Sequence, residues 1–242
     1  MDPKSNSHRS HAATAIVLLA ASSSAVATTQ GLADPRDPWE GFNRAVYSFN
    51  DTVDRAVVRP LAEIYQLVTP APIDRAVTNV FSNINDVVVL VNDLLQLKVE
   101  QAISDLGRIV ANTTFGVGGL FDVATRLGMD KHNEDFGQTL GYWGIDPGPY
   151  VVLPLLGPSS VRDTFGWAGD IARSPLASVG DPERAWLTEV GVVDTRADLL
   201  SVTRIAETAA LDPYVFLRDA YLQRRRYLVY DGEPPLLPED EE

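Results

Sequence analysis

Apolar residues recur every three or four positions along most of this chain, and this spacing limits the folds that the chain can adopt. It places the apolar side chains on one face of an amphipathic helix. Beyond the N-terminal region no segment contains 18 apolar residues in a row, whereas a helix that crosses a bilayer needs about 20. The sequence therefore predicts a largely helical fold with no membrane-spanning helix.

The first predicted helix extends from about Pro38 to Val58, and Pro60 lies in or just beyond its last turn. Further helices are predicted over 73–97, 99–113, 159–171, 181–190, 194–210 and 212–226. The start at Asp212 is the clearest, because an Asp side chain caps free N–H groups and Pro213 suits the first helical position. The predicted inward stripes are Trp39, Phe42, Val46, Phe49, Val53 and Val57 in the first helix, and Ile103, Leu106, Ile109 and Val110 in helix 99–113.

The run Val87–Val91 is apolar on every side of a helix. Because β-branched residues favour strands, a buried strand is the alternative for these five positions. The three-and-four spacing on either side of the run favours a helix that is either buried all round or in contact with lipid.

The segment from Gly137 to Pro158 combines many glycines and prolines with large apolar residues. Neither a helix nor a central strand tolerates so many breakers, so we expect an ordered apolar loop or a short hairpin. Trp and Tyr concentrate at the headgroup level of membranes, which makes this segment our candidate for that boundary. The predicted membrane-seated residues are Tyr142, Trp143, Tyr150, Val151, Val152, Leu153, Pro154, Leu155 and Leu156.

A glycine-rich loop follows helix 99–113, with three glycines among the four residues Gly116–Gly119. Glycine adopts backbone angles that are closed to other residues. Such a loop can bind phosphate through its backbone amides, or it can be a tightly packed turn between helices, and the spacing alone does not decide between them.

Residues 1–27 have the pattern of an export signal, with a basic start, an apolar core at Ala12–Ala21 and small residues at Ala25-Val26-Ala27. An uncleaved anchor is the alternative, although the core is too short to span a bilayer. We expect a single domain over 28–231 and a mobile acidic tail over 232–242. After removal of Asp2, Lys4 and Arg9, 18 basic and 32 acidic side chains remain, a net charge of about −14 that argues against nucleic-acid binding.

Residues that carry chemistry are scarce. His132 is the only histidine after residue 27, and Gly157–Val161 lacks the second glycine of a nucleophile elbow around Ser159 or Ser160. The spacing within Asp130–Asp135 matches no calcium or zinc motif, which favours a solvated polar turn. Arg224–Arg226 suits an ordinary solvated helix end. We therefore predict a protein that is not an enzyme and holds no metal or cofactor.

Several blocks of the sequence follow one another in the order typical of a known family. They read EGFNRxxYxFN at Glu40–Asn50, VRPxA at Val58–Ala62, GxGGxxD at Gly116–Asp122, FGxTLGxxGxxPGPYxxLPxxGP at Phe136–Pro158, TRADLL at 195–200 and DPYxxxRxAYxQRR at Asp212–Arg225. With these blocks the chain resembles the MlaA (VacJ) family of Gram-negative outer-membrane proteins.

The resemblance implies an all-α, ring-shaped protein in the inner leaflet of the outer membrane, with a central amphipathic channel. Phospholipid from the outer leaflet would pass through this channel to a periplasmic MlaC-type carrier, with no covalent step, and trimeric porins would be partners. The residues implied in the lipid path or its gate are Phe42, Asn43, Gly116, Val117, Gly118, Gly119, Leu120, Phe121 and Asp122.

Members of this family are commonly anchored through an acylated cysteine just after the signal peptide, whereas this sequence contains no cysteine. Either the natural start differs, or the fold and its partners hold the protein at the membrane. The alternative function is a periplasmic scaffold or adhesion protein without a lipid path.

Overall fold

The computed structural model describes residues 34–235. The predicted signal peptide and residues 236–242 of the predicted tail lie outside this range. The described chain is helical apart from one two-stranded sheet, which confirms the all-α prediction. None of its helices combines the length and hydropathy that crossing a bilayer requires.

The elements follow one another along the chain with short connections. They are α2 (Glu40–Val53), the π-helical turn η2 (Asp54–Val58), α3 (Arg59–Val68), α4 (Ala71–Leu95), α5 (Val99–Thr114), α6 (Val123–Arg126), α7 (Phe136–Tyr142), β1 (Tyr150–Leu153), β2 (Gly157–Ser160), α8 (Val161–Arg173), the 3₁₀ helix η3 (Pro175–Ser178), α9 (Glu183–Ala209) and α10 (Pro213–Val229).

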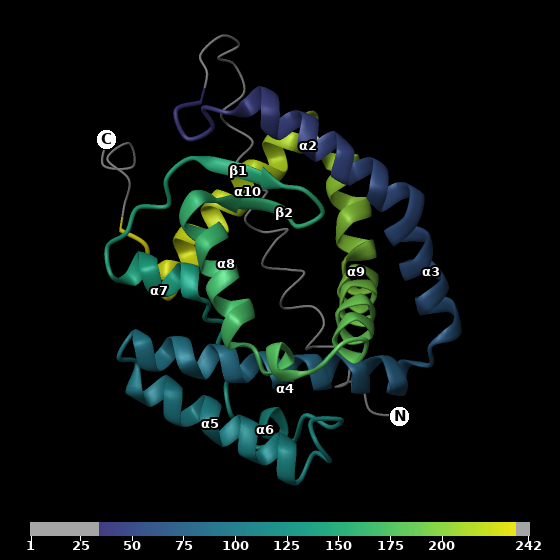
Figure 1. The fold of residues 1–242 in the computed structure, drawn as a ribbon, viewed down its shortest axis with the longest axis vertical. Helices are drawn as coiled ribbons and strands as arrows, with labels where there is room; N and C mark the ends of the chain where they lie inside the picture. Colours follow the sequence, from purple (N-terminus) through teal and green to yellow (C-terminus); the bar gives the residue numbers. More distant parts are fainter. Residues whose placement is uncertain (1–33, 236–242) are drawn as a thin grey trace.

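These elements form a closed circuit of contacts, which Figure 1 shows as a ring of helices. Helix α2 continues through η2 into α3, α3 packs on α9, and α9 packs on α4. The circuit continues from α4 to α7, α8 and β2, and it closes where β1 contacts α2. Helices α5 and α6 pack outside α4, while α10 supports β2 and α7.

The helical path does not end near Val58 as predicted, because the wider π-helical turn η2 connects α2 to α3 and accommodates the proline. In η2 the N–H of Arg59 donates to the carbonyl oxygen of Asp54, five residues earlier. Pro60 then lies in the first turn of α3, where its missing N–H costs no hydrogen bond. Helices α2 and α3 therefore follow one another along one side of the ring as a curved rod (Figure 1).

Two other boundaries also depend on packing. The run Val87–Val91 lies inside the continuous helix α4, as the helical interpretation predicted. The two helices predicted over 181–190 and 194–210 are one helix, α9, so the predicted break between them was wrong. Gly191 faces the ring of Phe81, and Asp194 is buried and accepts from the Tyr65 hydroxyl at 3.0 Å, so neither residue ends the helix.

The breaker-rich segment contains both a helix and a hairpin. Tyr150 pairs with Ser160 and Leu153 with Gly157, which confirms the predicted hairpin. The prediction of a loop was wrong for 137–142, which belong to α7. Glycine is required at this crossing of α7 and α8, because a Cβ on Gly166 of α8 would lie 2.4 Å from the backbone nitrogen of Gly137, and a Cβ on Gly137 would lie 2.5 Å from the Asp163 side chain.

Burial in this fold is inverted relative to an ordinary soluble domain. Asp105, Arg108 and Asn112 of α5 are buried, whereas all four tryptophans of the chain are exposed. The inward stripe predicted for α5 was therefore wrong, because Ile103, Leu106 and Val110 are exposed and Ile109 is only half-buried. In the first predicted helix likewise Trp39, Phe42, Phe49 and Val57 are exposed, whereas Asn43 is buried. Apolar core residues form small clusters, Ala62 with Ala197 and Leu200, and Tyr150 with Val152 and Tyr214.

The crossing of α7 and α8 gives a first prediction. Gly166→Ala should lower the free energy of unfolding by about 1–3 kcal/mol, because the added methyl group overlaps the α7 backbone. The matched control is Gly41→Ala in α2, where a Cβ meets nothing within 4 Å, and it should raise stability by about 0.5–1 kcal/mol. Urea unfolding of both variants checks the pair, and equal effects would contradict the close crossing.

Candidate functional site

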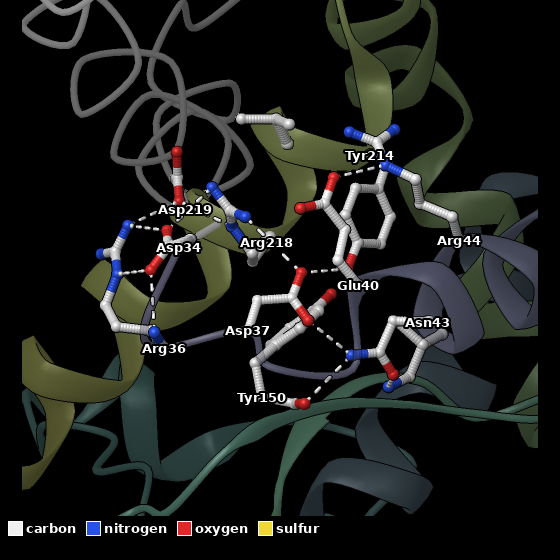
Figure 2. Close-up of polar contacts among 12 residues, drawn as sticks. Asp34, Arg36, Asp37, Glu40, Asn43, Arg44, Tyr150, Tyr214, Arg218 and Asp219 are labelled. Atoms are coloured by element: carbon white, nitrogen blue, oxygen red, sulfur yellow. Dashed lines mark hydrogen bonds and ion pairs between the residues drawn. The ribbon is translucent and has the colours of Figure 1, made fainter. Parts of the chain in front are cut away.

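Three of the sequence blocks meet in one buried polar joint, drawn in Figure 2. At its centre the Asn43 side chain is fully buried. Its Nδ2 donates to Asp37 Oδ1 at 2.7 Å and to the Tyr150 carbonyl oxygen at 3.0 Å, and its Oδ1 accepts from the Val152 N–H at 2.9 Å. Asn43 thus hydrogen-bonds the backbone of β1 as a neighbouring strand would, and it holds the hairpin against α2.

The C-terminal block completes this joint from α10. Asp37 is buried and accepts from the Tyr214 hydroxyl, and its Oδ2 lies 3.5 Å from Arg218 Nη1. Arg218 also pairs with Asp34 at 3.0 Å. The hydrogen bonds of Arg36 lower the pKa of Asp34 to about 2, so this acid stays ionised.

A second ion pair ties α2 to the start of α10. Arg44 Nη2 pairs with Asp212 Oδ2 at 2.8 Å, and its guanidinium lies 4.4 Å from the centre of the Tyr214 ring. The Arg44 hydrogen bond lowers the pKa of Asp212. Asp212 also accepts from the N–H groups of Tyr214 and Val215, which confirms the predicted helix cap.

Phe42 and Asn43 were predicted to act together in the lipid path, but they have different surroundings. Asn43 points into the joint, while the neighbouring Phe42 is 58% exposed on the surface of α2. Sequence reasoning identified the blocks but not their meeting, and it did not single out Asp37, Tyr214 or Arg218. A signal for these three residues was present in the sequence, because each of them lies close to a proline and an aromatic residue in or beside one of two such blocks.

The glycine-rich loop lies elsewhere, between α5 and α6. Gly118 and Gly119 have φ angles of 70° and 93°, and Asp122 caps α6 by accepting from the Thr125 N–H at 3.1 Å. The Asn112 side chain donates to Asp122 at 3.2 Å. Most apolar residues of the loop are exposed, namely Val117, Leu120 and Phe121. A cavity of about 270 Å³ adjoins the loop and is lined by Asn79, Asp122, Thr125 and Arg126.

Buried charges fill the space between α4 and α5. Arg108 is the largest fully buried side chain and donates to the Met129 carbonyl oxygen at 2.7 Å, while its Nη2 lies 3.4 Å from Asp122. Asp86 is paired with Lys131. Arg108 Nε also lies 3.6 Å from Asp86 Oδ2, so Arg108 connects the glycine-rich loop to the middle of α4.

The polar segment Asp130–Asp135 is part of the same interior. The prediction of a solvated turn was wrong for His132, whose Nδ1 contacts Asp105 Oδ2 at 2.9 Å, and for buried Glu134, which accepts from Lys98 at 2.9 Å. The segment also has three exposed residues, Asp130, Lys131 and Asn133. Asp105 on α5 and Lys98 on the α4–α5 connection hold His132 and Glu134 against the interior. The described residues contain no cluster of three or more potential metal ligands.

Asp93 faces Asp105 in this interior and is fully buried, with no hydrogen-bond donor on either carboxyl oxygen. Burial, together with the neighbouring Asp105 carboxyl, raises the pKa of Asp93 to about 8. The carboxyl group is therefore protonated in the folded protein at neutral pH, which removes the cost of a buried unpaired charge.

A second cavity of about 230 Å³ lies between the hairpin and helices α7, α8 and α10. It is lined by Asp135, Leu153, Leu156, Pro158, Ser159, Asp163, Trp167, Asp170, Tyr221 and Arg225.

Arg225 is largely buried and pairs with Asp135 and with Asp163, the latter at 2.9 Å. The solvated helix end predicted for Arg224–Arg226 was therefore wrong for Arg225. Burial alone would raise the pKa of Asp135 and of Asp163, but Arg225 lowers both.

The structure divides the predicted membrane-seated residues into three groups. Leu153 and Leu156 line the 230 Å³ cavity. Tyr150 and Val152 are buried in the apolar cluster beside Tyr214, and Val151 is half-buried. The remaining ones are exposed, namely Tyr142, Trp143, Pro154 and Leu155. The alternation of the strand thus puts neighbouring residues on opposite faces.

The fold and these sites define an all-α protein that, within residues 34–235, buries ten charged residues and exposes its four tryptophans. The chain belongs to the MlaA lipoprotein family, whose family model matches residues 35–228.

Individual proteins agree with this assignment. A Rickettsia prowazekii protein is 36% identical over 198 residues, which cover 81% of this chain and 78% of that protein. The intermembrane phospholipid transport system lipoprotein MlaA of Escherichia coli K12 is 34% identical over 201 residues, covering 81% of this chain and 80% of the relative. A solved structure from work on the structural basis for maintenance of bacterial outer membrane lipid asymmetry aligns with a TM-score of 0.72 and 32% identity, over 80% of this chain and 98% of the other.

The central joint gives a second prediction. Asn43→Ala should lower the free energy of unfolding by about 2–4 kcal/mol, because it leaves the Val152 N–H and the Tyr150 carbonyl oxygen buried without partners. Phe42→Ala is the control one residue away and should change stability by less than about 0.5 kcal/mol, since the ring is exposed. Thermal unfolding followed by circular dichroism measures both. A stable Asn43→Ala variant would contradict the role of Asn43 in holding the hairpin.

The buried Asp93 gives a third prediction. Its pKa is about 8 in the folded protein against an ordinary value of 3.8, so the folded state binds more protons between these values. Its contribution to the free energy of unfolding therefore falls as the pH rises through this window, by at most about 1.4 kcal/mol per pH unit. Asp93→Asn should remove this contribution. Unfolding of both proteins between about pH 5 and pH 8 tests it, and parallel pH profiles would show that Asp93 does not titrate there.

Proposed function

We propose that this protein transports phospholipid between the membranes of a Gram-negative envelope. It would remove phospholipid that is misplaced in the outer leaflet of the outer membrane. The observation that carries the proposal is the inverted burial around a closed circuit of helices, with carboxylates and guanidinium groups inside and all four tryptophans outside.

This arrangement suits a protein embedded in one leaflet. Exposed apolar surface of this extent marks contact with a membrane or a partner. Amphipathic helices can lie within a leaflet without crossing the bilayer. Trp and Tyr favour the headgroup level, where Trp39, Trp143 and Tyr142 would sit.

Lipid transport also requires a path that suits both parts of a phospholipid. A phospholipid combines a charged head with two apolar chains, so its path needs polar surface beside apolar surface. We propose that the ring of helices encloses an amphipathic channel that offers both kinds of surface. Movement of the lipid would follow its relative stability at the two ends of the path, with no bond in the lipid broken.

Two loops are proposed to control access to this path. The loop Gly116–Asp122 would be the gate, since its glycines allow movement and Asp122 anchors one end of it to α6. The hairpin would seat in the membrane through Leu155 and Leu156, which are exposed at its tip. Phe42 would contact lipid from α2, while Asn43 would set the position of the hairpin.

The proposed site of action is the periplasmic face of the outer membrane. The protein would associate there with trimeric porins and pass phospholipid to a soluble MlaC-type carrier. The name of the Escherichia coli relative, a lipoprotein of an intermembrane phospholipid transport system, supports this assignment.

The fourth prediction tests transport and the gate together in cells that lack their own MlaA. The wild-type protein should lower the phosphatidylethanolamine exposed at the cell surface, measured with a membrane-impermeant amine reagent. Gly118→Ala should alter this level, because a positive φ costs a non-glycine residue about 1–3 kcal/mol and shifts the loop between conformations.

Gly128→Ala is the matched control. Gly128 also has a positive φ and open space around its Cα, but it lies beyond the loop, so this variant should act as the wild type. If the wild-type protein leaves surface phospholipid unchanged, transport is wrong, and a scaffold function is then the better description. Equal effects of the two variants would contradict the gate alone.

A further inference from the structure

The 230 Å³ cavity between the hairpin and helices α7, α8 and α10 has two chemically different sides. Leu153, Leu156 and Trp167 form an apolar side. The other side carries Asp135, Asp163, Asp170 and Arg225, so three carboxyl groups face the cavity with one guanidinium group. A ligand that fits both sides must be an amphiphile that carries a positive charge.

Asp170 is the acid of this group that lacks a cationic partner. Its Oδ1 accepts from Asn92 Nδ2 at 3.0 Å and its Oδ2 from the Phe136 N–H at 2.9 Å, both of them neutral donors. No lysine, arginine or histidine within residues 34–235 forms an ion pair with it, whereas Asp135 and Asp163 are paired with Arg225. Burial raises the pKa of Asp170, and the more weakly interacting Arg173 guanidinium lowers it only in part. A cation bound here would offset that penalty.

Arg225 supplies the group that an anion needs. A guanidinium group has five N–H donors. Arg225 makes three hydrogen bonds, two to Asp135 and one to Asp163, so its Nη1 keeps one further N–H, whereas its Nε is buried. The carboxylates hold the side chain in a fixed orientation, so a remaining N–H can donate to a phosphate oxygen at little cost in side-chain entropy.

The size of the cavity limits what enters it. A volume of about 230 Å³ equals roughly eight water molecules at liquid density, which suits a small headgroup and excludes two acyl chains. The exposed Leu155, Phe165 and Ile171 belong to the hairpin and to α8, which also supply the apolar lining. Acyl chains that leave the cavity would extend over this surface.

We propose that this cavity is a headgroup site for phospholipids that carry an ethanolamine ammonium group. The ammonium binds Asp170, the phosphate accepts from Arg225, and the start of the acyl chains lies along Leu156 and Trp167. An anionic glycerol headgroup offers no cation to Asp170 and meets an excess of carboxylates. The site therefore selects phosphatidylethanolamine over phosphatidylglycerol. This inference rests on the proposed lipid transport and adds a headgroup preference to it.

The experiment uses the purified full-length protein, equilibrated with equal amounts of phosphatidylethanolamine and phosphatidylglycerol that have identical acyl chains. Native mass spectrometry then counts the retained lipid. We expect the wild-type protein to favour phosphatidylethanolamine by about tenfold, which corresponds to one charge-assisted hydrogen bond. In Asp170→Asn this ratio should fall to near one. Asp181→Asn is the matched control, since it removes an acid whose side chain is 69% exposed outside the cavity, and it should keep the wild-type ratio.

A third lipid keeps the test independent of how Asp170→Asn folds. N-Acetylated phosphatidylethanolamine retains the phosphate and chains but has no ammonium, and it should bind the wild-type protein about tenfold more weakly than phosphatidylethanolamine. Equal retention of all three lipids by the wild-type protein would overturn the headgroup site and leave lipid transport standing. An unchanged preference in a folded Asp170→Asn variant would also overturn it. Retention of no phospholipid by the wild-type protein would overturn the proposed transport together with the site.

Discussion

Buried charges must be paired, and the fold of this protein depends on that constraint. An isolated ionised group in a protein interior costs several kcal/mol, and removing one partner of a buried pair is strongly destabilising. Here Arg108, Asp37 and Arg218 are buried and each contacts polar partners from other parts of the chain. Such contacts join elements that have little apolar surface between them. The ring is therefore held together largely by specific polar joints, with only small apolar clusters in addition.

The distribution of apolar residues follows from the same organisation. When polar groups occupy the joints, many large apolar side chains of α2, α5 and α8 are left exposed. In water this surface would be costly, but a lipid environment removes the cost. Family membership and the exposed tryptophans thus support the same proposal from independent directions. Arg225 would have two roles in its cavity. It joins α7, α8 and α10 through its ion pairs, and it would bind a lipid phosphate.

Local patterns predicted the helices well and their orientation poorly. The three-and-four spacing located α4, α5 and α10, and Asp212 marks the start of α10 as its capping chemistry requires. The same spacing cannot tell which face of a helix is buried, because it reports only that two faces differ. In α5 the apolar face was expected inside, and the structure places it outside. The glycines of 137–142 were misjudged for a related reason, since a close helix crossing makes glycine favourable inside a helix.

By itself the sequence determined the helical class, the positions of most helices, a breaker-rich segment that is a loop or a hairpin, and the order of blocks that the MlaA family shares. These features depend on residues that are close in the sequence, so they can be predicted from the sequence alone. Only the tertiary structure decided which residues form the joints and the cavities. Asn43 hydrogen-bonds a residue 107 positions away, and Arg44 pairs with one 168 positions away. No local spacing encodes such pairs, because they arise when the ring closes and each buried polar group must find a partner.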